Sequence, residues 1–163
     1  MTTIDLRKLS APIENVKWRV QSFKTTQKGL KAICIPYVDA RDVQQRLDEV
    51  CGIENWQDRY KEVKGNLFCE IGIFIGNEWR WKSDVGTESN IEKEKGEASD
   101  SFKRAAVMWG IARELYNIKP LIIDAVDMKG KKYPLDKAAQ KPIYDGIVLS
   151  EYINSNLKKQ KSA

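Results

Sequence analysis

Three segments with the alternating pattern of β-strands follow one another between Trp56 and Val85, and they constrain the fold more than any other part of the chain. The turns between them contain Lys-Gly-Asn at 64–66 and Gly-Asn at 76–77, which are residues that tight hairpins favour. Because side chains alternate between the two faces of a strand, each segment places its apolar residues on one face. The pattern predicts a three-stranded antiparallel sheet with strands at Trp56–Val63, Leu67–Ile75 and Glu78–Val85.

A long helix is predicted after this sheet, from Ser89 to Asn117, with Ser89 and Glu92 as a capping box. At about 100° per residue, Lys103 falls in a polar seam between two apolar faces, and Arg104 lies at the edge of the second. A surface helix normally has one apolar stripe, so the pattern predicts cover on two sides. The first face consists of Phe102, Ala105, Ala106, Trp109, Ala112 and Tyr116, and the second of Val107, Met108, Ile111 and Leu115.

The rest of the chain predicts a hairpin, two further helices and a basic loop. A short helix at Ile4–Leu9 precedes two strands, Val16–Val20 and Leu30–Tyr37, across a turn at 25–29. Asp39 can cap a helix that runs to about Val50 and stops at Gly52. After Pro120 we expect an irregular loop around Lys129–Lys132, a helix at Ile143–Leu157 and a disordered basic tail.

The predicted fold is therefore α+β: a β-hairpin, a helix, a three-stranded antiparallel sheet and a long packed helix in the order β-β-α-β-β-β-α, with a C-terminal helical appendage. Residues 1–122 are expected to form the core. Residues 123–163 are expected to belong to the same domain or to form a subunit-contact appendage.

Composition argues against an enzyme. The chain has no histidine, which removes the commonest general base and metal ligand. Neither a GxxxxGK[ST] nor a GxGxxG motif is present, so we expect no cofactor and no metal. The net charge of +5 favours a polyanionic partner. A cytoplasmic protein with no membrane segment is expected, and three widely spaced cysteines predict buried free thiols: Cys34, Cys51 and Cys69.

Three segments, which together cover most of residues 16–117, carry a resemblance to a known family. They are PYVDARDVQQRLDEVCGIENW at 36–56, SDVGTES at 83–89 after the hydrophobic strand pair, and KGEASDSFKRAAVMWGIARELY at 95–116. The first is similar to the family's Tyr-hydrophobic-acid entry into a helix that ends in Gly-x-x-x-Trp. The third is similar to its Asp-x-x-Lys-Arg-Ala followed by an aromatic-Gly step. In this order they resemble the Rad-fifty-two family of single-strand annealing proteins, particularly the compact, Sak-like versions of bacteriophages.

The resemblance implies ATP-independent binding and annealing of single-stranded DNA in recombination and repair, by a homo-oligomeric ring or filament. It also implies a bacterial host cytoplasm, with a phage nuclease or host single-strand binding protein as further partner. The family's Lys-Arg pair matches Lys103 and Arg104, and its tyrosine matches Tyr37. An early-strand arginine matches Arg19 if a gap is placed in the 25–29 turn. A further arginine of the family is replaced here by Val107 or Met108.

Three more cations are candidate DNA contacts because they lie on the polar faces of predicted strands: Lys17, Arg80 and Lys82. Other interpretations stay open. Lys103 could be solvated or paired with Asp100 or Glu114, and Arg104 could be a surface arginine whose stem covers apolar side chains. Trp79 and Trp81 fit a core or an interface as well as a base-stacking platform.

Two other functions are considered. A passive single-stranded DNA-binding protein would stack bases on aromatic side chains without annealing strands. A metal-dependent nuclease would use carboxylates near the start of the long helix, although helix capping also explains them. Those carboxylates are Asp84, Glu88 and Glu92.

Overall fold

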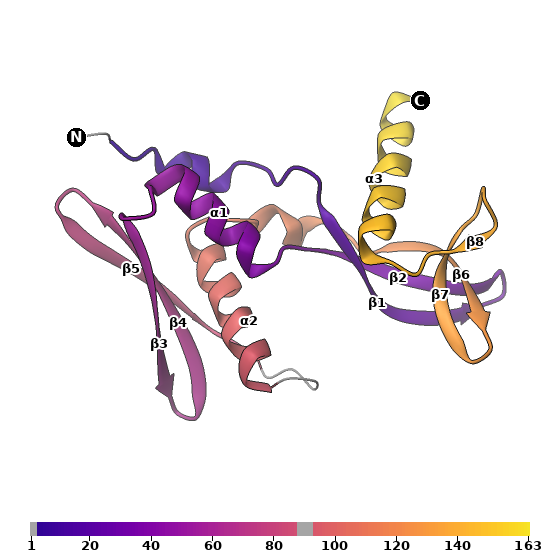
Figure 1. The fold of residues 1–163 in the computed structure, drawn as a ribbon, viewed down its shortest axis with the longest axis horizontal. Helices are drawn as coiled ribbons and strands as arrows, with labels where there is room; N and C mark the ends of the chain where they lie inside the picture. The colour runs from indigo at the N-terminus through magenta and orange to yellow at the C-terminus, as the bar shows by residue number, and fades with distance from the viewer. Residues whose placement is uncertain (1–2, 88–92) are drawn as a thin grey trace. The chain divides into compact units, whose positions relative to one another are not determined.

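The computed structural model describes residues 3–87 and 93–163, and the chain divides into two compact units (Figure 1). The first unit contains the residues up to Pro12 and Val38–Arg113. The second contains Ile13–Tyr37 and Glu114–Ala163. The class is α+β, as predicted. The division expected at residue 122 stays a prediction; strand β6, Leu121–Met128, spans it.

The first unit contains the predicted three-stranded antiparallel sheet. Its strands are β3 (Trp56–Val63), β4 (Asn66–Ile75) and β5 (Glu78–Val85). Both turns have the positive φ angles of tight hairpins, at Lys64 and Gly65 and again at Gly76 and Asn77. The side chains of β4 that face the helices are fully buried: Cys69, Ile71 and Ile73.

Helices α1 (Ala40–Cys51) and α2 (Lys93–Met108) lie against the sheet, and the 3-10 helix η1 (Leu6–Ser10) lies beside α1. The predicted caps of α1 are confirmed. The Asp39 carboxylate accepts the backbone N–H groups of Arg41 and Asp42, and Gly52 ends the helix with a φ of 85°. Phe102 of α2 packs near the Trp56 ring, at 6.3 Å between centroids.

The long helix ends earlier than the sequence predicted, at Met108 instead of Asn117. Gly110 has a φ of 94° and donates to the Val107 carbonyl, while Ile111 donates to the Ala106 carbonyl. This pair of bonds is a Schellman motif, which terminates helices at a left-handed glycine. The predicted pair of continuous apolar faces is therefore wrong, because the residues from Trp109 onward leave the helix axis. The predicted capping box at Ser89 and Glu92 lies outside the described residues.

The second unit is a five-stranded sheet in the order β1-β2-β6-β7-β8. Its strands are β1 (Lys17–Thr26), β2 (Gly29–Tyr37), β6 (Leu121–Met128), β7 (Lys131–Asp136) and β8 (Lys141–Pro142). The N-terminal hairpin is confirmed, although β1 extends six residues beyond the predicted end at Val20. The predicted irregular loop after Pro120 is wrong, because residues 121–136 form a second hairpin with its turn at Lys129 and Gly130.

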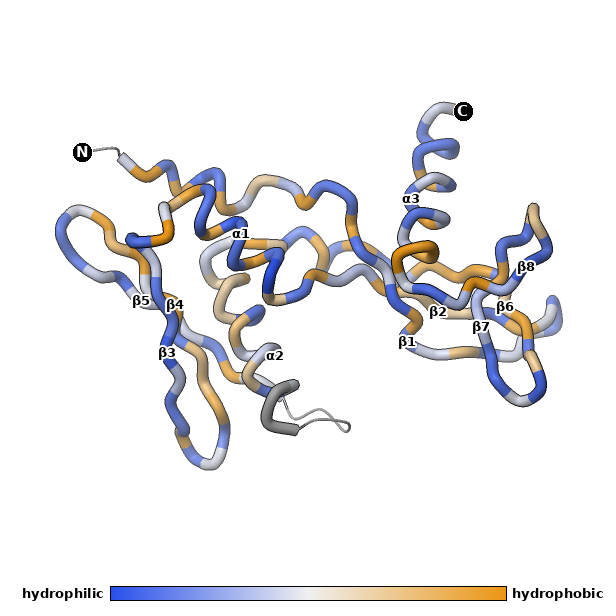
Figure 2. The backbone as a smooth tube through the Cα atoms, in the orientation of Figure 1, coloured by the Kyte–Doolittle hydropathy of each residue, from blue (hydrophilic) through white to orange (hydrophobic). Residues whose placement is uncertain are grey.

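Helix α3 (Gly146–Ser162) covers one face of this second sheet. Trp18 is 2% exposed, and its indole N–H donates to the Asn154 side chain of α3 at 2.9 Å. Figure 2 shows that α3 is hydrophobic in its first turn and hydrophilic toward its C-terminal end. The predicted disordered tail is wrong, since the helix continues to Ser162 with lysines in its last turn, where the helix dipole favours cations. No helix among the described residues has the length and apolar character needed to cross a bilayer.

Candidate nucleic-acid interface

Hydrogen bonds join the end of strand β5 and the residues after it to helix α2, which contains the predicted Lys-Arg pair. The ammonium of Lys82 donates to the Met108 carbonyl at 3.0 Å, at the last turn of α2. Farther along, Thr87 donates its backbone N–H and its hydroxyl to the Asp100 carboxylate, at 3.0 and 3.1 Å. Gly86 lies so close to α2 that a Cβ there would come within 2.4 Å of the Glu97 carbonyl oxygen. The strand and the helix are therefore in tight contact beside the Lys-Arg pair.

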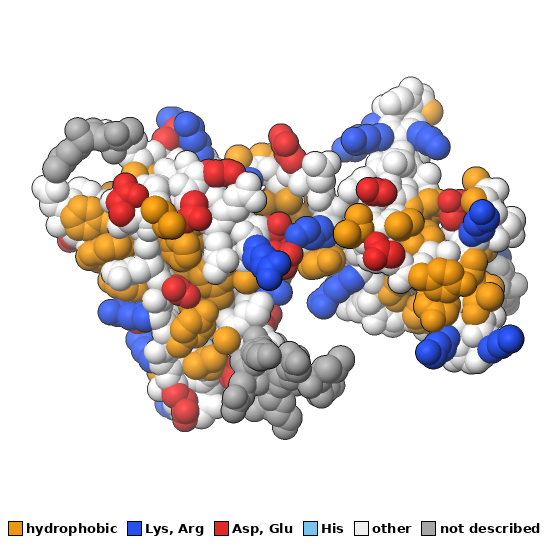
Figure 3. Space-filling model, viewed as in Figure 1, with side chains coloured by type: hydrophobic (Ala, Val, Ile, Leu, Met, Phe, Trp, Pro, Cys, Tyr) orange, Lys and Arg blue, Asp and Glu red, His pale blue; other side chains and the backbone are white. Residues whose placement is uncertain are grey.

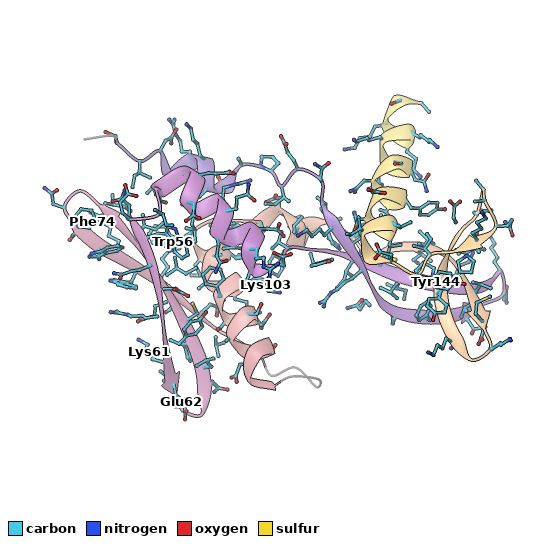
Figure 4. All side chains as sticks on the ribbon, in the orientation of Figure 1. Trp56, Lys61, Glu62, Phe74, Lys103 and Tyr144 are labelled. Carbon is cyan, nitrogen blue, oxygen red and sulfur yellow. The ribbon has the colours of Figure 1, made fainter. Side chains whose placement is uncertain are left out.

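Lys103 projects from α2 without a charged partner among the described residues, and Figure 4 shows it on the helix layer of this unit. The two acids that the sequence offered as partners are engaged elsewhere. Asp100 accepts from Thr87, and Glu114, in the second unit, accepts the Ile13 backbone N–H at 2.7 Å. No ion pair joins Lys103 to Asp100 within the first unit as described, and the interpretation of Lys103 as a solvated cation stays open.

Arg104 is partly compensated by an acid that sequence reasoning did not connect with it. Its Nε lies 3.6 Å from the Asp84 carboxylate, and their side chains are 39% and 30% exposed. At this distance the two atoms form an ion pair but not a hydrogen bond, and the buried Nε has no hydrogen-bond partner among the described residues. The terminal amino groups of the guanidinium are the part that an anion can reach.

Arg80 and Lys82 are exposed as predicted, but they lie on the face of the three-stranded sheet that packs against α2. Register places Lys82 beside Ile71 and Arg80 beside Ile73. Both cations already have partners. Arg80 pairs with Glu78 at 2.8 Å, and the Lys82 ammonium lies 4.8 Å from the centre of the Trp109 ring while it caps α2.

The tryptophans Trp79 and Trp81 lie on the opposite, outer face of this sheet, so a place in the core between sheet and helices is excluded. Trp81 lies over Gly72, and the Arg59 guanidinium stacks on its ring at 3.8 Å from the centroid. Arg59 in turn bonds to Glu70 at 2.6 Å. Trp81 is half-buried by these contacts, and Trp79, 37% exposed, is the more accessible of the two rings.

The other predicted contacts lie in the second unit, on the face of its sheet that α3 leaves uncovered. Lys17 pairs in register with Tyr37, and Arg19 with Ile35, so these side chains share one face. The Arg19 guanidinium lies 5.8 Å from the centre of the Tyr37 ring, within the range of a cation–π contact. The predicted site residues therefore form two groups: Lys17, Arg19 and Tyr37 in this unit, and Arg80, Lys82, Lys103 and Arg104 in the other.

The surface of both units carries exposed hydrophobic side chains as well as cations (Figure 3). Of the carboxylates considered for a nuclease, Glu88 and Glu92 lie outside the described residues, and Asp84 accepts the backbone N–H of Val85 and pairs with Arg104. Among the residues with described positions, no three potential ligands cluster closely enough to hold a metal ion. All three cysteines are free and buried, as predicted.

Comparisons with known proteins match most of this chain. The sequence model of a family described as "Rad52/22 family double-strand break repair protein" matches residues 5–132. A protein of Deinococcus radiodurans called single-stranded DNA-binding protein DdrA is 32% identical over 109 residues, which are 66% of this chain and 51% of that protein. The protein of the same name in Deinococcus deserti is 31% identical over 109 residues, 66% of this chain and 53% of its own. The chain thus spans about half the length of these relatives.

Proposed function

Because this chain belongs to the Rad52/22 family of double-strand break repair proteins, we propose that it binds single-stranded DNA and promotes the pairing of complementary strands without ATP. The observation that carries the proposal is the adjacent pair on α2: Lys103 without a charged partner among the described residues, and Arg104 with only a loose one. Two relatives that are named single-stranded DNA-binding proteins support the choice of ligand.

The chemistry of the pair fits a polymer that is read through its backbone. Lysine and arginine bind phosphates without reading sequence, and such contacts leave the Watson–Crick edges of the bases free to meet a complement. Duplex formation gains about 1.4 kcal/mol per base step, so annealing is downhill and needs no coupled hydrolysis. We therefore assign Lys103 and Arg104 as phosphate contacts, with Lys17, Arg19 and Tyr37 as a second group. Arg80 and Lys82 are weaker candidates than Lys103 because they have partners within the first unit.

We propose further that several copies act together, as a ring or a filament. A few cations bind a single strand weakly, and repetition of the same contacts along one strand raises the affinity steeply. Exposed apolar side chains of the second unit support contacts between copies, in particular Ile122, Tyr144 and Ile147, which are 67%, 67% and 72% exposed. A bacteriophage source and a nuclease or single-strand binding partner stay predictions from the resemblance.

Strand annealing is the experiment that tests this function against a passive single-stranded DNA-binding protein. Two complementary labelled oligonucleotides are mixed with and without protein, and duplex formation is followed by fluorescence energy transfer without ATP. We expect faster annealing with wild-type protein, and a rate near that of free DNA with Lys103→Ala/Arg104→Ala. A protein that binds both oligonucleotides yet slows or does not change their annealing would be a passive binder, and the annealing proposal would be rejected.

A further inference from the structure

The ion pair between Arg104 and Asp84 differs from the other acid–base contacts of the first unit. Glu70 binds Arg59 at 2.6 Å and Lys61 at 2.9 Å, both at hydrogen-bond distance. The Asp84 carboxylate remains 3.6 Å from the Arg104 Nε, which stays buried without a hydrogen bond among the described residues. Arg104 is therefore attracted to Asp84 by its charge but is not held there by a hydrogen bond from Nε.

The carboxylate of this pair is the fixed partner. Asp84 accepts the Val85 backbone N–H at 2.8 Å and lies in β5, between the contacts that Lys82 and Thr87 make with α2. The strand and the helix edge are thus joined on both sides of Asp84. Arg104, by contrast, is attached through a long flexible side chain that is 39% exposed. Any change in the pair is a movement of the guanidinium and not of the carboxylate.

We propose that Asp84 is a built-in competitor for the DNA phosphate at Arg104, which lowers the affinity of this contact so that a bound strand can be released to its complement. The proposal rests on the proposed function. A phosphate that binds Arg104 brings a second negative charge near the Asp84 carboxylate, and the two anions repel each other. Lys103, next to Arg104, has no such competitor among the described residues, so the two cations of the pair differ in how strongly they hold a phosphate. Lys103 supplies steady attraction, and Arg104 supplies a contact that is easily given up.

The test is the affinity of Asp84→Asn for a short single-stranded oligonucleotide, measured by fluorescence anisotropy at low salt. Removal of one charge about 7 Å from a phosphate predicts binding about threefold tighter in a water-like dielectric. Glu62→Gln is the matched control, since it removes one exposed acid of the same sheet, in β3, that lies outside the proposed contacts. It corrects for the change in net charge, and we expect a smaller effect from it. Asp84→Ser is the second variant, with the same expected direction.

The direction of the change separates the proposal from a structural role. Partial unfolding weakens binding and does not tighten it, so tighter binding by a folded variant supports competition. Equal or weaker binding by both Asp84 variants would overturn the proposal and make Asp84 a positioning residue for Arg104. Loss of the folded state in both variants, measured by circular dichroism, would also overturn it. If wild-type protein does not bind the oligonucleotide at all, the proposed function itself fails. If wild-type protein binds the oligonucleotide and both Asp84 variants bind it with the same affinity, the proposed function stands and only the competition by Asp84 is rejected.

Discussion

The salt dependence of DNA binding by Lys103→Gln tests the central assignment most directly. Lys103 has no charged partner among the described residues, so its whole charge is available to a phosphate. Each neutralised phosphate of a single strand contributes about 0.7 to the slope of log affinity against log salt concentration. The variant should therefore lose about 0.7 from this slope for each subunit in contact with the strand. Glutamine has a helix propensity close to that of lysine, so the fold should not change.

This slope translates into a defined change in the ratio of affinities. Between 50 and 200 mM salt, a slope difference of 0.7 changes the ratio of wild-type to variant affinity by about 2.6-fold, with the larger defect at low salt. Fluorescence anisotropy over this range with one oligonucleotide measures it. Lys8→Gln is the control, because Lys8 is an exposed lysine of η1 outside the proposed contacts. Parallel slopes for wild type and Lys103→Gln would refute the assignment, as would an equal loss of slope in Lys8→Gln.

Three further predictions concern the fold of the two units. Gly72→Ala places a Cβ 2.8 Å from the Trp81 ring, and this overpacking should lower the free energy of unfolding by about 1–3 kcal/mol in urea denaturation; unchanged stability would mean that Trp81 moves freely. Lys61 and Arg59 hold the pKa of Glu70 below its ordinary value through hydrogen bonds. This contribution to stability is complete above the ordinary glutamate pKa of about 4.3 and is lost as the pH falls through the lower folded-state pKa. The free energy of unfolding of Glu70→Gln should therefore fall less between neutral and acidic pH than that of wild type. Burial raises the pKa of the cysteine thiols, to about 11 for Cys34 and Cys51 and to about 12 for Cys69. None of the three should therefore react with a disulfide reagent at pH 8 until denaturant is added.

Strand alternation and turn residues predict the sheet of the first unit but miss the second hairpin of the other unit. The Lys-Gly pair at 64–65 predicts a hairpin turn, and the structure has one there. For the same dipeptide at 129–130 the sequence predicts part of an irregular basic loop, but in the structure it joins β6 to β7 and also has positive φ angles. The lysines around this turn favour the prediction of a solvated loop. The apolar residues before the turn nevertheless have the composition of a strand.

The end of the long helix differs from its prediction for a related reason. Periodicity continues through Gly110, so the apolar positions of Ile111 and Leu115 appeared to extend one helix face. In the structure they are buried after the helix has ended, at 1% and 8% exposure. Burial without helical continuity gives the same sequence pattern, and only the glycine distinguished the two cases. The pairing of Arg104 with Asp84 could not be predicted at all, because it depends on how the strand and the helix meet in space.

The negative C-terminal end of α2 opposes the binding of a phosphate at the proposed site, and neighbouring cations offset this effect. The C-terminal end of a helix carries a partial negative charge, and Met108 is the last residue of α2, one turn after Arg104. A phosphate at the Lys-Arg pair would be repelled by these terminal carbonyls if they were open. Two cations cover them: Lys82 donates to the Met108 carbonyl, and Arg113 donates to the carbonyls of Val107 and Met108. Lys82 can thus favour DNA binding without touching DNA, because it neutralises the helix end that would otherwise oppose the phosphate.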